Sequence, residues 1–314
     1  MSFKTDSLVK LNSGHSIPRI GFGVFQTEPS ETTDSVFVAL EAGYRHIDSA
    51  KIYGNERDAV EGILKFLEKP GQTVKREDIF YTTKIWNDDQ GYEKGLAGID
   101  EALDKLSGHS KEGQTDRNLG YIDLILIHNP ITSREKRLGT WKALQEGLKT
   151  GKIKSIGVSN YGIPHLEELF NWEGQTIIPA VNQIELHPWL QRTELVEYLR
   201  NKNIVPVAYS PLTRCLRFND PKLVELAKRY NKSVAQILIK WSLQAGFVPI
   251  PKSTHPQRIK ENIDVDDFEL SAKEFEELGD KNENGFSVWD PITFPVDADT
   301  KGNTNFKEFM EFLF

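Results

Sequence analysis

Eight apolar, strand-like segments recur from one end of the chain to the other, and this repetition constrains the fold more than any other feature. Helical patterns separate the segments, which begin roughly 25 to 45 residues apart, as expected of β/α units. Most are continuously apolar, which is typical of parallel strands covered on both faces. The predicted strands are Pro18–Gln26, Tyr44–Ala50, Ile79–Trp86, Tyr121–His128, Ile153–Asn160, Ala180–Glu185, Ile204–Ser210 and Phe247–Lys252.

Signals for helix N-termini lie between several of these strands. A capping residue, or a proline at the first helical position, predicts where such a helix begins. In a capping box, the side chains of the cap and of the residue three positions later each accept a hydrogen bond from the other's backbone N–H. The predicted starts are Ile163-Pro164, Asp220-Pro221, Ser233-Val234-Ala235-Gln236 and His255-Pro256.

Three segments fall outside the alternation. Leu8–Pro18 contains a tight-turn signal at Asn12-Ser13-Gly14 and predicts a β-hairpin at one end of the fold. Ser107–Gly120 is polar and is interpreted as an exposed loop, while residues 282–314 are expected to form a C-terminal tail over the active-site face. The chain is therefore predicted to be α/β, with one (β/α)8 TIM-barrel domain over residues 1–314.

Charge and cysteine content exclude several classes of function. The 39 Lys and Arg against 46 Asp and Glu leave a net charge of −7, which argues against nucleic-acid and membrane partners. Cys215 is the only cysteine, so neither an intrachain disulfide nor a cysteine-based zinc site can form, and no metal site is expected. Without a signal peptide or a long apolar run, a cytoplasmic protein is expected. The chain is further expected to be a monomer or weak dimer.

Four reactive side chains, Asp48, Tyr53, Lys84 and His128, follow the predicted strands. Active sites of such barrels lie at the C-terminal ends of the strands, so these four are expected on one rim. Each also has an ordinary structural interpretation. Asp48 could cap a helix, Lys84 could pair with a surface carboxylate, and Tyr53 and His128 could be packed in the core.

Together the four residues predict proton-transfer chemistry. A lysine at the end of a buried strand needs a counter-ion, and Asp48 on a neighbouring strand is the natural one. Lys84 is expected to lower the pKa of Tyr53 from its usual value of about 10. Tyr53 would then act as a general acid toward a developing alkoxide, while His128 donates to the same carbonyl oxygen.

A phosphate site is predicted at the end of the eighth strand. The segment Gly21–Gln26 lacks the third glycine of a dinucleotide-binding loop and opens no helix, so it is rejected. Lys252, Ser253 and Arg258 instead supply two cations and a hydroxyl where barrels commonly bind phosphate. A solvated basic patch is the alternative interpretation.

Three long motifs resemble those of the aldo-keto reductase family, in the family's order and over nearly the whole chain. The first is Gly43–Ala50, continued by Tyr53-Gly54-Asn55-Glu56, and the second is Lys154–Tyr161. The third runs from Ile250-Pro251-Lys252-Ser253 through Arg258 to Asn262. The order and length of these motifs make the resemblance specific.

The resemblance implies hydride transfer with NADPH as the cofactor. It implies Tyr53 as the proton donor, Lys84 and Asp48 as the groups that tune it, and His128 as the residue that orients the carbonyl. The cofactor contacts that it implies are Ser159, Asn160 and Gln183 at the nicotinamide amide, Tyr209 on the ring, Ser210 and Leu212 along the pyrophosphate, Lys252, Ser253 and Arg258 at the 2′-phosphate, and Asn262 at the adenine.

The substrate pocket is expected to be aromatic and broad in specificity. Phe25, Trp86 and Tyr53 would form its wall, and Trp289 or Phe286 of the tail would close it, although Trp289 could equally be a packing residue. Asn129 stands where many relatives carry an aromatic residue, so that wall should be smaller and more polar. No arginine is evident for a carboxylate, which favours simple aldehydes and ketones.

The segment after Leu212 departs from the family pattern. The usual glycine is absent, and only a short run separates Leu212 from Asp220. A long loop folded over the pyrophosphate is therefore not expected, and the cofactor should leave more easily. Cys215 is interpreted as a loop residue, not as a nucleophile.

Two other functions are compatible with such a barrel. One is an aldolase in which Lys84 forms a Schiff base with the substrate. The other is a non-catalytic module that senses NADP, against which the intact set of four reactive side chains argues.

Overall fold

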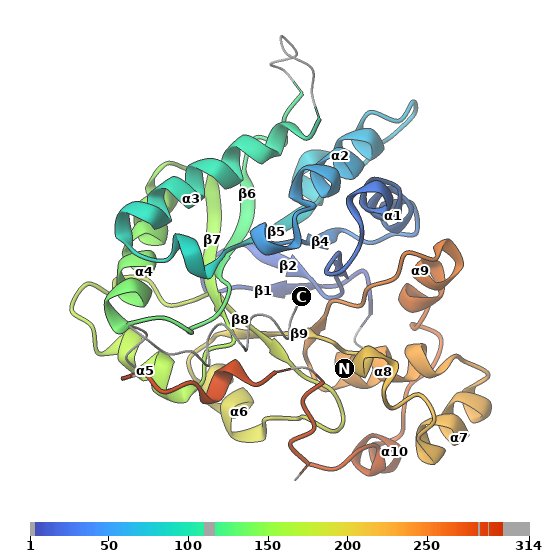
Figure 1. Cartoon of the computed structure of the whole chain (residues 1–314). Helices are drawn as coiled ribbons and strands as arrows, with labels where there is room; N and C mark the ends of the chain where they lie inside the picture. Colours follow the sequence, from blue (N-terminus) through green and yellow to red (C-terminus); the bar gives the residue numbers. More distant parts are fainter. Residues whose placement is uncertain (1–3, 110–116, 282, 288, 298–314) are drawn as a thin grey trace.

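Eight parallel strands form the centre of the molecule, and helices surround them (Figure 1). The computed structural model describes residues 4–109, 117–281, 283–287 and 289–297. The sheet order β10-β9-β8-β7-β6-β5-β4-β3 follows the chain, and each strand pairs in parallel with the next. The predicted (β/α)8 architecture is thereby confirmed.

The elements alternate along the chain as expected. The strands of the barrel are β3 (Phe22–Gly23), β4 (His46–Asp48), β5 (Phe80–Ile85), β6 (Ile122–Ile127), β7 (Ile153–Ser159), β8 (Val181–Glu185), β9 (Val205–Tyr209) and β10 (Val248–Pro249). The α-helices are α1 (Pro29–Glu41), α2 (Glu56–Leu67), α3 (Tyr92–Asp104), α4 (Arg134–Lys149), α5 (Ile163–Phe170), α6 (Thr193–Asn201), α7 (Pro221–Tyr230), α8 (Val234–Gln244), α9 (Pro256–Ile263) and α10 (Ala272–Glu277).

Two glycines allow the first strand to meet the last. Gly21 N donates to Pro249 O over 2.9 Å, and Gly23 N donates to Pro251 O over 3.0 Å. A Cβ on Gly21 would lie 2.4 Å from Nδ1 of His46, so no larger residue fits without displacing its neighbours. The glycines of the rejected dinucleotide pattern therefore have a structural role in closing the barrel.

The barrel strands are apolar on both faces because both faces are covered. Leu124 and Leu126 of β6 belong to the cluster inside the barrel, together with Leu11 and Ile17 of the hairpin segment. The residues between and after them, Ile125 and Ile127, belong to the larger cluster between strands and helices. This two-sided burial is the reason why the strand segments read as continuous apolar runs.

The predicted helix starts are confirmed, and two of them carry side-chain caps. The Asp220 carboxylate accepts hydrogen bonds from the backbone N–H groups of Lys222 and Leu223 at the start of α7. Ser233 and Gln236 form the predicted capping box of α8. Each cap satisfies backbone N–H groups that the helix itself leaves free.

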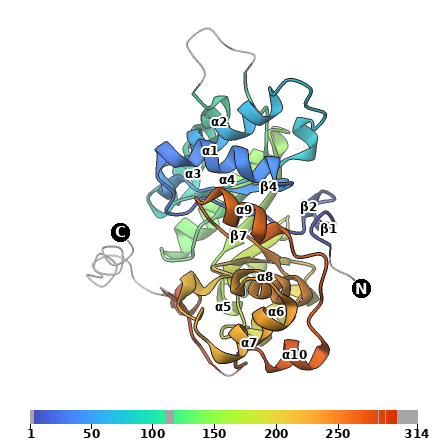
Figure 2. The same ribbon diagram turned by 90° about the vertical axis from the view of Figure 1, so that its right-hand side faces the viewer.

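The first barrel strand is shorter than predicted. Its expected first residue, Pro18, belongs to a separate two-stranded sheet. Ser16–Pro18 forms β2 and pairs antiparallel with β1 (Leu8–Lys10), which confirms the hairpin. The barrel strand begins only at Phe22. Figure 2 shows this hairpin and the tail, which contains the short helix η6 (Pro291–Thr293), on opposite sides of the barrel.

The remaining irregular segments are only partly described. Residues 110–116 of the predicted loop and residues 282, 288 and 298–314 of the predicted tail lie outside the described residues. The described tail packs at the C-terminal ends of the strands, where Ile292 O lies so near Gly162 that an added Cβ would be 2.5 Å away. Among the described helices, none is long and apolar enough to cross a membrane.

Candidate active site

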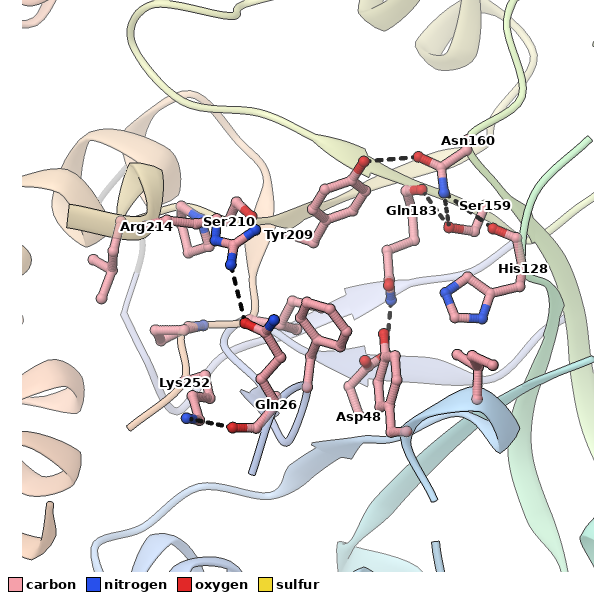
Figure 3. A pocket seen from close by; sticks show the side chains of 18 of the residues that line it. Gln26, Asp48, His128, Ser159, Asn160, Gln183, Tyr209, Ser210, Arg214 and Lys252 are labelled. Atoms are coloured by element: carbon pink, nitrogen blue, oxygen red, sulfur yellow. Dashed lines mark hydrogen bonds between the residues drawn. The ribbon is translucent and has the colours of Figure 1, made fainter. Parts of the chain in front are cut away.

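A pocket of about 330 Å³ opens at the C-terminal ends of the barrel strands (Figure 3), and this volume is within the range of small-molecule sites. Its polar lining comes from several strand ends, because successive parallel strands direct their last residues to the same rim. The residues that line it include Phe25, Gln26, Asp48, Tyr53, Trp86, His128, Ser159, Asn160, Gln183, Tyr209, Ser210, Leu212, Arg214, Lys252 and Trp289.

Asp48, the last residue of β4, binds two neighbours at the floor of this pocket. Lys84 Nζ of β5 donates to Asp48 Oδ1 over 2.6 Å, and Gln183 Nε2 of β8 donates to Oδ2 over 2.7 Å. Asp48 and Lys84 are each 1% exposed. The pair is thus a buried ion pair whose carboxylate oxygens both have partners.

The Lys84 ammonium is fully engaged. Its three protons have three acceptors, which are the Asp48 carboxylate, the Ser49 carbonyl at 2.8 Å and the Tyr53 hydroxyl at 3.4 Å. Burial lowers the pKa of Lys84, and the charge of Asp48 opposes that shift. Lys84 does not line the pocket, so its amine is poorly placed to attack a carbonyl.

Tyr53 lies above this pair, at the end of the short helix η1 (Lys51–Tyr53). The expected direction of its pKa shift is wrong, because burial and then the charge of Asp48 raise the pKa well above 10. The lysine charge is offset by a carboxylate only 2.6 Å away, closer than the Tyr53 hydroxyl at 3.4 Å. Tyr53 therefore holds its proton at neutral pH, as a proton donor must.

His128 follows β6 and stands edge-on to two aromatic rings. Its ring centroid lies 5.6 Å from that of Tyr53 and 5.0 Å from that of Trp86. Burial, with a further contribution from Lys84, lowers the pKa of His128 well below its usual value. The neutral ring then has one N–H donor, and Nδ1 has no hydrogen-bond partner among the described residues.

Four amide and hydroxyl side chains line the pocket beyond His128. Asn160 Nδ2 donates to His128 O over 3.0 Å and to Ser159 Oγ over 3.2 Å, and Ser159 Oγ donates to Gln183 O over 2.8 Å. Tyr209 OH donates to Asn160 Oδ1 over 2.9 Å (Figure 3). This cluster of Ser159, Asn160, Gln183 and Tyr209, here called the amide cradle, offers donors and acceptors of the kind that a carboxamide needs.

Cations lie at the opposite end of the pocket. Lys252 Nζ donates to Gln26 O over 3.0 Å, and Arg214 Nη2 donates to Gln26 Oε1 over 3.1 Å. Figure 3 shows both contacts converging on Gln26. Their positive charge suits a phosphate-bearing ligand.

The remaining residues predicted to bind the 2′-phosphate and the adenine lie beyond the pocket lining. Ser253 Oγ accepts a hydrogen bond from His255 N over 3.1 Å at the start of α9. Arg258 is exposed on α9, and Asn262 on the same helix is buried. The structure thus brings Lys252 into the pocket and leaves these three on the adjoining loop and helix.

All the residues predicted for the wall of the substrate pocket line it, except Asn129. Phe25 and Tyr53 have ring centroids 5.0 Å apart, and Trp86 and Trp289 line the same pocket. The placement of Asn129 in this wall is wrong. Its side chain is fully buried, with Nδ2 donating to Asn87 Oδ1 over 2.6 Å and Oδ1 accepting from Ile131 N over 2.9 Å.

Among the lining residues that were not predicted from the sequence are Gln26 and Arg214. The short helix η5 (Thr213–Cys215) holds Arg214 at φ 50°, in the left-handed region that few side chains adopt. The segment is short, as expected, yet Arg214 reaches Gln26 on another loop. The sequence did contain a signal for Arg214, because this residue follows the seventh barrel strand and the loops after the strands form the site in such barrels.

The described residues contain no cluster of three or more His, Cys, Asp or Glu side chains that could hold a metal ion.

Comparisons with known proteins agree with this architecture. The sequence model of the Aldo/keto reductase family matches residues 19–283. The chain is 44% identical over 290 residues to an uncharacterised oxidoreductase of Schizosaccharomyces pombe, covering 92% of this chain and 99% of that protein. It is 42% identical over 277 residues to the glyoxal reductase of Bacillus subtilis, covering 88% and 93%. A solved aldo-keto reductase of Bombyx mori in complex with NADP has a TM-score of 0.78 and 32% identity, with 97% of each chain covered.

Proposed function

The chain belongs to the aldo/keto reductase family, and on this premise we propose that it reduces aldehydes and ketones to alcohols with NADPH. The observation that carries the proposal is the contact of Lys84 Nζ with both the Asp48 carboxylate and the Tyr53 hydroxyl at the floor of the pocket. The NADP complex of the Bombyx mori relative and the reductase activity in the name of the Bacillus subtilis relative support it.

The amide cradle would hold the nicotinamide end of NADPH. Ser159, Asn160 and Gln183 would bind its carboxamide, and Tyr209 would lie against the ring. The main chain at Ser210 and Leu212 would follow the pyrophosphate. Lys252, Ser253 and Arg258 would bind the 2′-phosphate, and Asn262 the adenine. When bound there, NADPH supplies the hydride.

The chain's own residues would bind the carbonyl and supply the proton. His128 would donate a hydrogen bond from its neutral ring to the carbonyl oxygen and so fix its position. The Tyr53 hydroxyl would give its proton to that oxygen as negative charge develops there. Lys84, only 3.4 Å from the Tyr53 hydroxyl, would stabilise the phenolate that remains. Phe25, Trp86 and Trp289 would exclude water and contact an apolar substrate.

The loss of NADPH absorbance on addition of an aldehyde tests this function. We expect turnover with small aldehydes, glyoxal included, and with aromatic aldehydes, because the pocket wall is mainly aromatic. A chain that binds NADPH but consumes none across a panel of aldehydes, ketones and sugars would contradict the proposal.

An aldolase with Lys84 as its Schiff-base nucleophile would have to disengage a buried ammonium from three acceptors. Borohydride reduction in the presence of a keto substrate would trap such an adduct. We expect no increase in mass at Lys84.

Arg258→Ala should weaken NADPH binding by about 10- to 100-fold, because a charge-assisted contact with the 2′-phosphate is lost. NADH lacks that phosphate, so its Kd should change by no more than about twofold. Calorimetric titration of both cofactors measures the difference. Lys260→Ala removes a neighbouring exposed cation of α9 and serves as the matched control. Equal weakening of NADH and NADPH would place the phosphate site elsewhere.

A further inference from the structure

One buried side chain, that of Asn55, joins the loops that carry Tyr53 and Phe25. Asn55 directly precedes α2 and is 0% exposed. Its amide nitrogen Nδ2 donates to Val24 O and to Thr27 O, each over 2.9 Å. An amide nitrogen has two protons, so one is available for each carbonyl, and the turn that bears Phe25 is held at both ends.

The amide oxygen of Asn55 closes the loop that contains Tyr53. Ser49 Oγ donates to Asn55 Oδ1 over 3.1 Å, and Ser49 is also 0% exposed. Ser49 directly follows β4, and Tyr53 ends η1 between the two bonded residues. The main-chain oxygen of Ser49 in turn accepts from Lys84 Nζ over 2.8 Å. The loop of Tyr53 is therefore fixed to β5 at one end and to the turn of Phe25 at the other.

These contacts set how the proposed proton donor lies relative to the aromatic wall. Phe25 and Tyr53 follow different strands, β3 and β4, and their ring centroids lie 5.0 Å apart. A buried carbonyl that loses its donor is costly, so the Asn55 amide favours one arrangement of the two loops. Asn55 lies outside the pocket lining, so it acts on a ligand only through the residues that it holds.

We propose that Asn55 is a positioning residue for proton transfer, because its amide holds the Tyr53 hydroxyl in register with the pocket wall. The inference rests on the proposed function, in which Tyr53 protonates the carbonyl oxygen. Its physical basis is the steep dependence of proton transfer on geometry. The donor must be within hydrogen-bond reach of the acceptor, and a displacement of about 1 Å can lower the rate by about 10²-fold.

Asn55→Ala tests the inference, because it removes the contacts to both loops. We measure NADPH oxidation in a single turnover after premixing the full chain with the cofactor and adding an aromatic aldehyde. The rate at saturating aldehyde should fall about 10- to 100-fold. The KM of the aldehyde should change by no more than about threefold, since the substrate does not touch Asn55.

Ser49→Ala is a milder variant that keeps the contacts of Asn55 with the turn of Phe25. It removes one neutral hydrogen bond within the loop of Tyr53, so the rate should fall about 2- to 10-fold. This variant tests the inference even if Asn55→Ala does not fold.

The double variant Asn55→Ala/Tyr53→Phe separates a positioning role from a general structural one. Without the Tyr53 hydroxyl there is no proton donor left to position. In the Tyr53→Phe background, Asn55→Ala should therefore lower the remaining rate by no more than about twofold. A side chain that only stabilises the fold would lower the rate by the same factor in both backgrounds.

Gln145→Ala is the matched control, because it removes another buried amide that bonds to the main chain of a loop. Gln145 is 6% exposed, its Nε2 donates to Gly174 O over 2.9 Å, and its Oε1 accepts from Thr176 N over 2.8 Å. That loop precedes β8 and so lies at the end of the barrel opposite the pocket. Both Asn55→Ala and Gln145→Ala should lower the thermal unfolding midpoint, but Gln145→Ala should leave the single-turnover rate within about twofold.

Three results would overturn the inference. One is an unchanged rate at saturating aldehyde in folded Asn55→Ala, or in Ser49→Ala if the first variant does not fold. Another is an equal loss of rate in the unmodified and the Tyr53→Phe backgrounds, and the third is a change confined to the KM of the aldehyde. Failure of the proposed function would be seen separately, since the unmodified chain would then oxidise no NADPH with any aldehyde.

Discussion

Replacing Tyr53 by Phe should lower kcat for aldehyde reduction by about 10² to 10⁴-fold, because the variant lacks the only proposed proton donor. NADPH should still bind with a Kd within about threefold of the unmodified value, since the hydroxyl has no proposed contact with the cofactor. Single-turnover measurement of NADPH oxidation after premixing with cofactor would isolate the chemical step from cofactor binding.

Tyr44→Phe is the matched control for this substitution. The Tyr44 hydroxyl is buried and has no hydrogen-bond partner among the described residues, so its removal should leave turnover unchanged. If Tyr53→Phe retained full turnover, Tyr53 would not be the acid. If it also abolished NADPH binding, its main role would lie in cofactor binding.

Asp48→Asn should destabilise the fold by about 3 to 5 kcal/mol, because it leaves the Lys84 ammonium buried without a counter-ion. Both residues are 1% exposed, so water cannot replace the lost carboxylate. Equilibrium denaturation in urea gives the free energy of unfolding of each variant. Aldehyde reduction should fall as well, since the position of Lys84 depends on this carboxylate.

The double variant Asp48→Asn/Lys84→Met tests whether the lost stability comes from the unpaired charge of Lys84. Removing both charges should recover most of the lost stability, while reductase activity stays low. The Glu41–Lys69 pair, with side chains 34% and 46% exposed, provides a surface comparison. Glu41→Gln should change the free energy of unfolding by no more than about 1 kcal/mol. An effect of Asp48→Asn as small as that would mean that Lys84 loses its proton when the carboxylate is removed.

The order of the barrel could be predicted because its signals are local. Apolar runs such as Tyr121–His128 mark strands wherever both faces are covered, and caps such as Asp220 mark helix starts independently of distant contacts. Strand bounds were less certain, because hydrogen bonding decides them. Pro18 belongs to the hairpin and not to β3, a division that the apolar pattern of Pro18–Gln26 cannot show.

The residues of the candidate site were predictable as a set, although their contacts were not. Once the fold is a parallel barrel, polar residues after the strands must share one rim, and this places Asp48, Tyr53 and His128 in one pocket. Asn129, one residue beyond His128, turns instead toward Asn87 and is lost from that pocket. A difference of one position in a loop thus changes which residues line the pocket.

By itself the sequence determined the barrel, the rim on which its reactive residues gather and the family to which the chain belongs, because these depend on periodicity and short motifs. Only the tertiary structure decided the direction of the pKa shift of Tyr53, the meeting of Arg214 with Gln26 and the hydrogen bond from Tyr209 to Asn160. These features depend on burial and on distances of a few ångströms between residues far apart in the chain, and no local pattern encodes either.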